Sequence, residues 1–369
     1  MRPVLRCGGL GVSKRQAVRV EMSGLVAHPK AMFVDQQCSG DGDGDGDGDG
    51  AGEARASGRR GLCFAHLSDP HLTSLEGVRW RQLMNKRMLG YLSWRRRRRA
   101  EHRMEVLDAL LRDLATVNPE HIVITGDLTH TGLPHEFHQA RAWLERLGAA
   151  DSVTVVPGNH DAYARHLWWD TFSHWEPFMR SDVRRTGSSG QDIFPSLRVR
   201  NGIALIGLSS ARASAPFLAT GSLGRSQLRR LQALLSEAGA ERLFRVVLLH
   251  HPPRPGDETW RKRLTDGAAL CAVLERAGAE LVLHGHCHRS LHSELQLGER
   301  RIPVFGIASA SAIGNGHGTR AQYSVCRVAP SAEGWSVQVS VRGFRPDTEA
   351  FQLEHEHHLS LATMDSASC

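Results

Sequence analysis

Short apolar runs alternate with segments of helical period along the chain from residue 61 onward. A short continuous apolar run is typical of a buried strand, whereas apolar positions three and four residues apart mark one face of an amphipathic helix. The pattern predicts buried strands over residues 64–67, 121–125, 153–156, 203–208, 245–249 and 280–283. It predicts helices over residues 104–117, 137–147, 228–238 and 268–277. Strands that alternate with helices indicate an α/β fold.

The last apolar runs differ because no helical segment separates them. Residues 302–308, 323–328 and 335–341 follow one another directly, which predicts neighbouring antiparallel strands. Together with the earlier strands and helices, they predict a mixed α/β sandwich. The residues after Pro346 continue neither pattern, so we expect residues 346–369 to form a loose C-terminal tail.

The first 60 residues contain no sustained periodicity, and five Asp-Gly dipeptides occupy residues 41–50. Such a composition buries little apolar surface, so a disordered N-terminal arm is expected over residues 1–60. A calcium site is disfavoured there, because an EF-hand loop ends in a glutamate and a calcium-binding β-roll needs an apolar residue in every turn. Arg2 and Arg6 are followed by glycines instead of an apolar run, which does not resemble a secretory signal.

Composition and charge narrow the class of protein. Hydrophobic residues (41%) and charged residues (23%) lie near globular averages, and 369 residues suffice for one α/β domain with tails. Lysine plus arginine (46) exceeds aspartate plus glutamate (39), which favours anionic partners such as phosphates, nucleic acid or acidic lipid. The seven cysteines include no C-x-x-C pair, and no apolar stretch reaches the ~18 residues of a membrane span. A reducing compartment and a cytoplasmic location are therefore expected.

Two insertions interrupt the alternation of strands and helices. Residues 79–99 combine apolar side chains with the basic run Arg95–Arg99, so this segment is amphipathic and basic. Residues 167–178 contain five aromatic residues, namely Trp168, Trp169, Phe172, Trp175 and Phe178. Either segment is suited to cover a neighbouring surface.

Oxygen and imidazole side chains follow five of the predicted strands, at the ends where open α/β sheets bind ligands. The first three strands lead, in order, into Asp69 with His71, into Gly126-Asp127, and into Asn159-His160-Asp161. The strands at 245–249 and 280–283 lead into His250 with His251, and into His284, His286 and His288. Several imidazoles gathered at strand ends are typical of a transition-metal site and not of a hydrophobic core.

Each motif by itself has a simpler interpretation. Asp-x-His and Gly-Asp are common in turns, and Asn159 or Asp161 is suited to cap a helix. Cys287 is a conceivable thiolate ligand, but it alternates with the histidines on either side, so we expect it to point elsewhere and pack. The five motifs occur in order, each after an apolar strand, and this order favours one metal centre over five unrelated turns.

The motifs resemble those of the calcineurin-like metallophosphoesterase superfamily. The matching positions are Asp-x-His at 69–71, Gly-Asp at 126–127, Gly-Asn-His-Asp at 158–161, His-x-Pro at 250–252 and Gly-His-x-His at 285–288. The resemblance covers about residues 61–345, which would be the metallophosphoesterase domain. It implies a four-layer sandwich of two mixed β-sheets flanked by helices. It also implies two divalent metal ions, typically Fe, Mn or Zn, and mixed nitrogen and oxygen ligation suits each of them.

The resemblance further implies a role for each matching residue. It assigns seven metal ligands: Asp69, His71 and His288 to one ion, Asn159, His250 and His286 to the other, and Asp127 to both. His160 matches the family's catalytic histidine, which faces the phosphate and the leaving group and does not bind metal. A hydroxide that bridges the two ions would be the nucleophile. His251 and His284 match no ligand position.

The residues after Gly-Asp differ from those of phosphoprotein phosphatases. That branch continues Gly-Asp-x-x-Asp-Arg-Gly, whereas this sequence reads Gly126-Asp127-Leu128-Thr129-His130-Thr131-Gly132. The layout, including His250-His251-Pro252-Pro253, looks more like the branch that contains bacterial cyclic-nucleotide phosphodiesterases. A phosphate ester is therefore the expected substrate, and a phosphodiester the first choice.

Two other functions fit parts of the sequence. The basic, amphipathic insertion 79–99 suits a hydrolase at the inner membrane surface, which would contact anionic lipid and act on a lipid-linked pyrophosphate or phosphodiester. A solvated basic loop explains the same residues. Arg95–Arg99 also suit a non-catalytic protein that binds nucleic acid through its phosphates. The intact ligand set argues against this last function.

Overall fold

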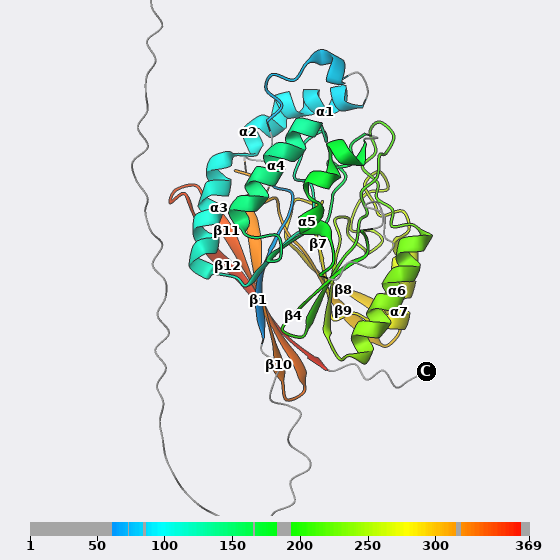
Figure 1. The fold of residues 1–369 in the computed structure, drawn as a ribbon. Helices are drawn as coiled ribbons and strands as arrows, with labels where there is room; N and C mark the ends of the chain where they lie inside the picture. Colours follow the sequence, from blue (N-terminus) through cyan, green and yellow to red (C-terminus); the bar gives the residue numbers. More distant parts are fainter. Residues whose placement is uncertain are drawn as a thin grey trace, which may run out of the picture. The chain divides into compact units, whose positions relative to one another are not determined.

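Two six-stranded mixed β-sheets form the body of the computed structural model, which describes residues 61–72, 74–83, 86–164, 167–182, 193–314 and 319–362 (Figure 1). The first sheet has the order β12-β11-β10-β1-β2-β3, with the bounds β1 Leu62–Leu67, β2 His121–Ile124, β3 Val153–Val155, β10 Gln322–Ser331, β11 Gly334–Arg345 and β12 Ala350–Ala362. The second has the order β4-β5-β6-β7-β9-β8, with the bounds β4 Ser196–Arg200, β5 Ile203–Gly207, β6 Phe244–Leu248, β7 Leu281–His284, β8 Leu291–Leu297 and β9 Arg300–Gly306. The predicted N-terminal arm, residues 1–60, lies outside the described residues.

Helices flank both sheets. Their bounds are α1 Arg87–Ser93, α2 Arg99–Glu101, α3 Met104–Val117, α4 Pro134–Leu147, α5 Glu176–Met179, α6 Arg225–Ala240 and α7 Gly267–Ala277. Shorter helical segments are the 3-10 helices η1 Trp80–Leu83, η3 Trp168–Asp170 and η4 Phe172–His174 and the π-helix η2 Trp94–Arg98. In the part of the chain that the structure describes, no helix has both the length and the apolar character needed to span a bilayer.

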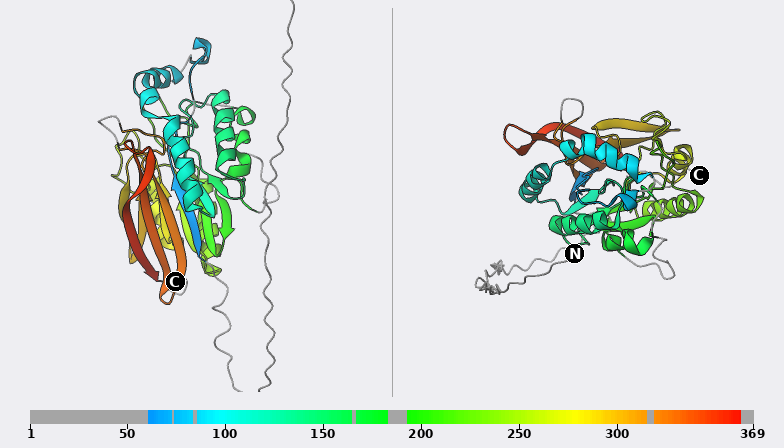
Figure 2. Two further views of the ribbon diagram at one scale, coloured as in Figure 1. Left: turned by 90° about the vertical axis from the view of Figure 1, so that its left-hand side faces the viewer. Right: turned by 90° about the horizontal axis from the view of Figure 1, so that it is seen from above.

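Hydrophobic cores separate four layers. Residues of both sheets build the core between them, for example Phe64 and Val123 from the first sheet and Leu205 and Val246 from the second. Because successive strand residues face opposite sides, the alternate positions face outward, where α3 and α4 cover the first sheet and α6 and α7 cover the second. Seen from above, helices lie on both sides of the sheets (Figure 2). The expected fold, two mixed β-sheets flanked by helices, is confirmed.

The prediction of a loose tail after Pro346 is wrong for most of the segment. Residues 350–362 form β12, which pairs antiparallel with β11 along its length. Only Phe351 of this strand is buried, and polar residues such as Glu356 and His358 occupy the exposed positions. The strand therefore lacks the apolar run by which a buried strand is recognised, because it lies at the edge of its sheet.

The prediction that residues 302–308 pair with the next two strands is also wrong. β9 belongs to the second sheet, where it runs parallel to β7 and antiparallel to β8. The sequence pattern missed β8, because Leu295 is its only fully buried residue. β10 and β11, by contrast, form the expected antiparallel pair.

The two insertions occupy different places in the fold. Residues 80–83 and 87–101 form η1, α1, η2 and α2, which lie above the strands in Figure 1. The aromatic segment instead completes the core beside α4, because Trp175 and Phe178 are buried and the ring of Trp175 lies 4.4 Å from that of Phe137. The aromatic insertion therefore covers the first sheet's outer core.

Candidate metal centre

The predicted ligands follow parallel strands of both sheets. The loops after β1, β2 and β3 carry Asp69 with His71, Asp127, and Asn159. The loops after β6 and β7 carry His250, and His286 with His288. Since the carboxyl ends of parallel strands meet at one edge, the topology brings five loops to the same end of the sandwich.

Five of these seven residues have a left-handed backbone. The φ angles are 51° at Asp69, 39° at His71, 56° at Asp127, 69° at His286 and 51° at His288. This conformation is uncommon outside glycine and costs about 1–2 kcal/mol per residue. Strain of this kind persists where the surrounding structure imposes it, which happens most often at functional sites.

Asp127 lies between imidazoles that come from different sheets. Its Oδ2 is 3.4 Å from His250 Nε2 and 3.9 Å from His71 Nε2. Asn159 Oδ1 is 3.2 Å from the same His250 nitrogen. One carboxylate thus faces ligand-type atoms on both sides.

The remaining residues close the group around Asp69. His288 Nε2 is 3.1 Å from Asp69 Oδ1, and the backbone N–H of His286 donates to Asp69 Oδ2 at 2.9 Å. His286 Nδ1 is 3.2 Å from His250 Nε2. The structure therefore brings all seven predicted metal ligands into one cluster.

Backbone carbonyls fix which ring nitrogen faces the cluster. His71 Nδ1 donates to the Thr129 carbonyl at 3.0 Å, and His250 Nδ1 donates to the Thr125 carbonyl at 2.7 Å. A carbonyl only accepts, so each Nδ1 carries a proton and each Nε2 is the ring nitrogen that faces the cluster. Histidines that bind metals are typically oriented by such a bond from the second ring nitrogen.

Two buried nitrogens in the cluster have no hydrogen-bond partner among the described residues: His71 Nε2 and His286 Nε2. Buried polar atoms are nearly always paired, so these two indicate a missing partner. Lone-pair nitrogens beside carboxylate and amide oxygens form the mixed donor set that Fe, Mn and Zn accept. The residues present therefore fit a divalent metal centre.

The protonation of the imidazoles agrees with this interpretation. Burial lowers the pKa of His71 and of His286 well below the usual value, so both rings are neutral and able to bind a cation. His250 differs: burial lowers its pKa, but the charges of Asp127 and Asp69 outweigh burial and raise it to about 9. Without a metal, a proton on His250 partly balances the two carboxylates.

Asp161 holds the loops together behind the ligands. Its carboxylate accepts hydrogen bonds of 2.9 Å from the backbone N–H groups of Asp127, Thr129 and Gly158.

Two glycines allow the motif loops to lie close together. Position 158 requires glycine because a Cβ there would lie 2.2 Å from Asp127 Oδ1. Gly285 is required in the same way, because its Cβ would lie 1.7 Å from Ser68 Oγ. The glycines of two motifs thus allow the loops to pack.

His160 lies beside the cluster and is nine-tenths buried. Its Nδ1 donates to the His130 carbonyl at 2.6 Å, and its ring lies edge-on to His71 with 5.0 Å between centroids. Burial and the charge of Arg98 lower the pKa of His160 well below the usual value. The ring lines a cavity of about 550 Å³ together with Asp127, Asn159, His286 and His288.

The two histidines without a ligand position make hydrogen bonds within the protein. His251 Nε2 donates to the Ala219 carbonyl at 3.1 Å, and Ser210 Oγ bonds its Nδ1 at 2.7 Å. Both nitrogens of His251 are therefore used within the protein, which favours His250 as the ligand of the pair. His284 Nδ1 donates to the Gly285 carbonyl at 2.9 Å.

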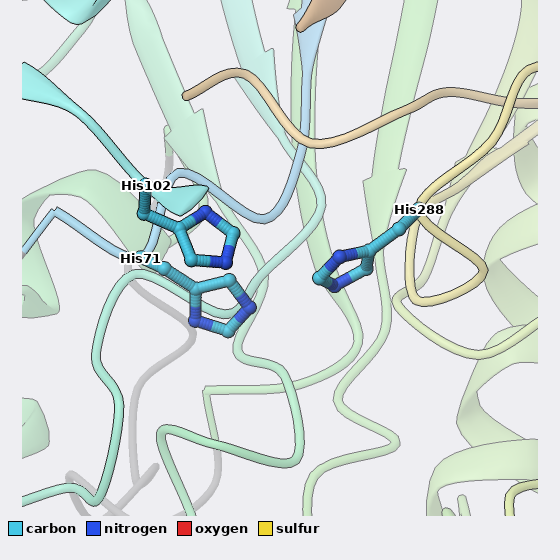
Figure 3. A group of neighbouring side chains, drawn as sticks. All are labelled: His71, His102 and His288. Atoms are coloured by element: carbon cyan, nitrogen blue, oxygen red, sulfur yellow. The ribbon is translucent and has the colours of Figure 1, made fainter. Parts of the chain in front are cut away.

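His102 is a neighbour of the cluster that the sequence motifs did not reveal. Its ring nitrogen lies within 4.8 Å of ligand atoms of His71 and His288, and the three rings turn toward one space (Figure 3). His102 Nδ1 is 2.8 Å from Ser311 Oγ, and burial lowers the pKa of His102 well below the usual value. The sequence offered no motif for His102, which comes three residues after the basic insertion, because its approach to the cluster depends on how that insertion docks.

Comparison with known proteins identifies similar sequences. The model of the calcineurin-like phosphoesterase family matches residues 63–290. A cAMP/cGMP dual specificity phosphodiesterase of Mycobacterium tuberculosis is 28% identical over 254 residues, which are 67% of this chain and 66% of that protein. A glycerophosphodiester phosphodiesterase of Enterobacter lignolyticus is 28% identical over 173 residues, which are 46% of this chain and 56% of that protein. The match thus spans just under two thirds of the first relative and little more than half of the second.

A solved structure supports the fold. A dimetal phosphatase from Danio rerio superposes with a TM-score of 0.50 at 13% sequence identity, covering 80% of this chain and 98% of that one. At this identity the likeness concerns the arrangement of sheets and helices alone.

Proposed function

Because the chain belongs to the calcineurin-like phosphoesterase family, we propose that it is a metal-dependent hydrolase of phosphate esters whose substrate is a phosphodiester. The convergence of seven oxygen and nitrogen donors from five loops carries this proposal, together with the two buried imidazole nitrogens that lack a partner. Five of the seven donors have a left-handed backbone, and strained residues of this kind cluster at functional sites.

The cluster divides into two ligand sets. The proposed sets are Asp69, His71 and His288 for one ion and Asn159, His250 and His286 for the other, with Asp127 shared. Bound divalent ions, whether Fe, Mn or Zn, would activate water and neutralise the phosphoryl charge. Asp127 fits the shared role because its Oδ2 faces imidazoles of both sets.

The protein's own groups then orient the ester. His160 donates a hydrogen bond from Nδ1 to the His130 carbonyl, so Nε2 is the ring nitrogen available to a substrate in the cavity. The negative charge of a bound phosphate raises the pKa of a neighbouring imidazole, which prepares His160 to give a proton to the departing oxygen.

Two observations favour a diester over a monoester. The names of both relatives specify diesters, cyclic nucleotides in one case and glycerophosphodiesters in the other. The segment after Asp127 lacks the Asp-Arg pair of phosphoprotein phosphatases and instead places His130 beside the cluster, where its carbonyl binds His160. A diester therefore suits the site better than a phosphoprotein.

This proposal predicts a specific activity profile. Protein loaded with Mn, Fe or Zn is expected to hydrolyse bis-p-nitrophenyl phosphate with a kcat/KM at least about tenfold above that for p-nitrophenyl phosphate, a difference of about 1.4 kcal/mol in transition-state binding. A chelator should abolish the activity, and one of the three metals should restore it. A preference for the monoester would contradict the choice of substrate, and inactivity with every metal would contradict the proposal as a whole.

The exposed face of the basic insertion favours a second property, contact with an anionic membrane surface. Trp80 is 64% exposed, and Met88 and Leu92 are each 39% exposed, beside the exposed Arg95 and Arg96. Apolar and basic side chains on one helical face suit the interface of an anionic bilayer. A lipid-linked phosphodiester or pyrophosphate would then reach the cavity from that surface.

Vesicle flotation tests this contact. The wild-type protein is expected to float with vesicles that contain phosphatidylglycerol and to stay below those of pure phosphatidylcholine. Replacing Arg95 and Arg96 with alanine should weaken the association about fivefold per arginine, since each basic residue near the surface contributes about 1 kcal/mol. Equal flotation of the wild type with both kinds of vesicle, or of wild type and variant, would end this part of the proposal.

A further inference from the structure

The basic insertion has an inner face as well as an exposed one. Successive residues of its inner face are spaced by three or four positions: Arg87, Gly90, Trp94 and Arg98. The first three of these are buried and the fourth is half-buried, whereas Met88, Leu92, Arg95 and Arg96 are exposed. This is the periodicity of a helix with one face against the protein. The run of arginines is therefore divided, and Arg98 belongs to the inner side.

Specific contacts dock this inner face. Arg87 donates to the carbonyls of Thr131 and Gly132, each at 3.2 Å, in the loop that follows Asp127. Trp94 is 5% exposed and packs in a small cluster with Leu75 and Leu133. Arg98 lies one helical turn after Trp94. Its position is thus fixed by packing that does not depend on the arginine itself.

A second anchor joins the start of the insertion to another part of the body. Lys86 Nζ donates to the Leu218 carbonyl and to Ser214 Oγ, both at 2.8 Å, and lies 4.7 Å from the ring centroid of Tyr163. The ring of Tyr163 in turn stacks on His160 with 5.4 Å between centroids. The insertion therefore contacts neighbours of the residues that line the cavity, since Tyr163 stacks on His160 and Leu218 precedes Ala219.

Arg98 enters the cavity of the metal centre. It lines this cavity together with Asp127, Asn159, His160 and His288, and its Nη1 is 3.1 Å from His160 Nδ1. Burial lowers the pKa of Arg98, while Asp127 and Asp69 act in the opposite direction, so the guanidinium keeps its charge. A positive group thus lies beside the histidine that faces the substrate.

The contact with His160 does not satisfy this guanidinium. His160 Nδ1 lies 2.6 Å from the His130 carbonyl, which only accepts, so the ring nitrogen carries a proton and cannot accept another from Arg98. Across residues 61–362, gaps excepted, Arg98 also forms no ion pair within 4.0 Å. A half-buried cation whose hydrogen-bond contact is to a nitrogen that cannot accept is expected to have an anion as its partner.

We propose that Arg98 binds a phosphoryl oxygen of the substrate beside the metal centre, an inference that rests on the function proposed above. The guanidinium offers a planar fork of N–H donors, which matches the oxygens of a phosphate ester. A bound phosphate would accept the hydrogen bonds of Arg98 that His160 Nδ1 cannot accept. The inserted segment thereby contributes a substrate-binding group that the five motif loops lack.

Inorganic phosphate, the simplest phosphoryl ligand, provides the probe. Its Kd for the metal-loaded protein is measured by calorimetry, and its inhibition constant is measured with bis-p-nitrophenyl phosphate. Arg98→Ala and Arg98→Gln are expected to weaken phosphate binding about 10- to 100-fold, as for loss of a charged hydrogen bond. Arg98→Lys should recover part of the loss, because it keeps the charge without the fork. Metal content should match the wild type in all three variants.

Arg81→Ala is the matched control, since it removes the same charge from an exposed position of the same insertion and should leave phosphate binding unchanged. Phosphate binding within about twofold of wild type in both neutral Arg98 variants would overturn the inference. Loss of the metals from these variants would also overturn it, because Arg98 would then support the metal centre instead of binding the substrate. If the wild type binds phosphate through Arg98 yet hydrolyses no diester, the proposed function fails and the binding role stands.

Discussion

Replacing Asp127 with alanine is expected to remove both metal ions from the protein and to lower diester turnover by about a thousandfold or more, equivalent to about 4 kcal/mol of transition-state stabilisation. The reason is geometric. Asp127 Oδ2 lies 3.4 Å from His250 Nε2 and 3.9 Å from His71 Nε2, so one side chain is shared by both proposed ligand sets. Loss of any other ligand weakens one set, whereas loss of Asp127 weakens both. Elemental analysis of dialysed protein gives the number of metals per chain.

A second variant separates the loss of metal from a general loss of structure. Asp127 Oδ1 accepts a 2.7 Å hydrogen bond from the backbone N–H of His160, and Asp127→Asn keeps an oxygen for that bond while it removes the charge. We expect Asp127→Asn to melt near the wild-type temperature and still to bind less metal. Asp151→Ala, at an exposed carboxylate, should change neither property. Two metals per chain in both Asp127 variants would show that this residue is not shared between ions.

The buried strands and their loops were predictable because two independent patterns coincide there. Strands such as β5 and β7 are buried on both faces, so their apolar runs are nearly continuous in the sequence. The loops that follow them contain residues whose identity is dictated by close packing, as at Gly158, or is explained by the proposed metal binding, as at Asp127. The family membership inferred from these motifs is confirmed by the match over residues 63–290.

The elements that escaped prediction lack such a pattern. β8 and β12 each bury a single residue fully, so their strand character depends on pairing with distant segments and not on their own apolar residues. Arg98 and His102 escaped prediction for a different reason. They are one arginine in a run of five and one histidine among 21, and only the docking of the insertion directs them toward the centre. Local sequence carries no trace of that tertiary arrangement.

His160 should be separable from the metal ligands by its leaving-group dependence. His160→Ala is expected to keep the wild-type metal content while turnover of a diester with an alkyl leaving group falls about 100- to 10,000-fold, the usual range for a lost general acid. The fall should be smaller with p-nitrophenolate, which departs readily without a proton. Since the Nδ1 of His160 is engaged by the His130 carbonyl at 2.6 Å, the ring is held in place for the other nitrogen to act.

The comparison of leaving groups distinguishes proton transfer from other roles of the same side chain. His160→Gln retains a hydrogen-bonding group without an imidazole and should show the same dependence on the leaving group as His160→Ala. His358→Ala, at an exposed position of β12, controls for the loss of a histidine as such. If both leaving groups are affected equally, His160 acts by binding the phosphate, as proposed for Arg98 beside it. If the metals are lost as well, His160 is a ligand, and the division of the cluster into seven ligands and one acid must be redrawn.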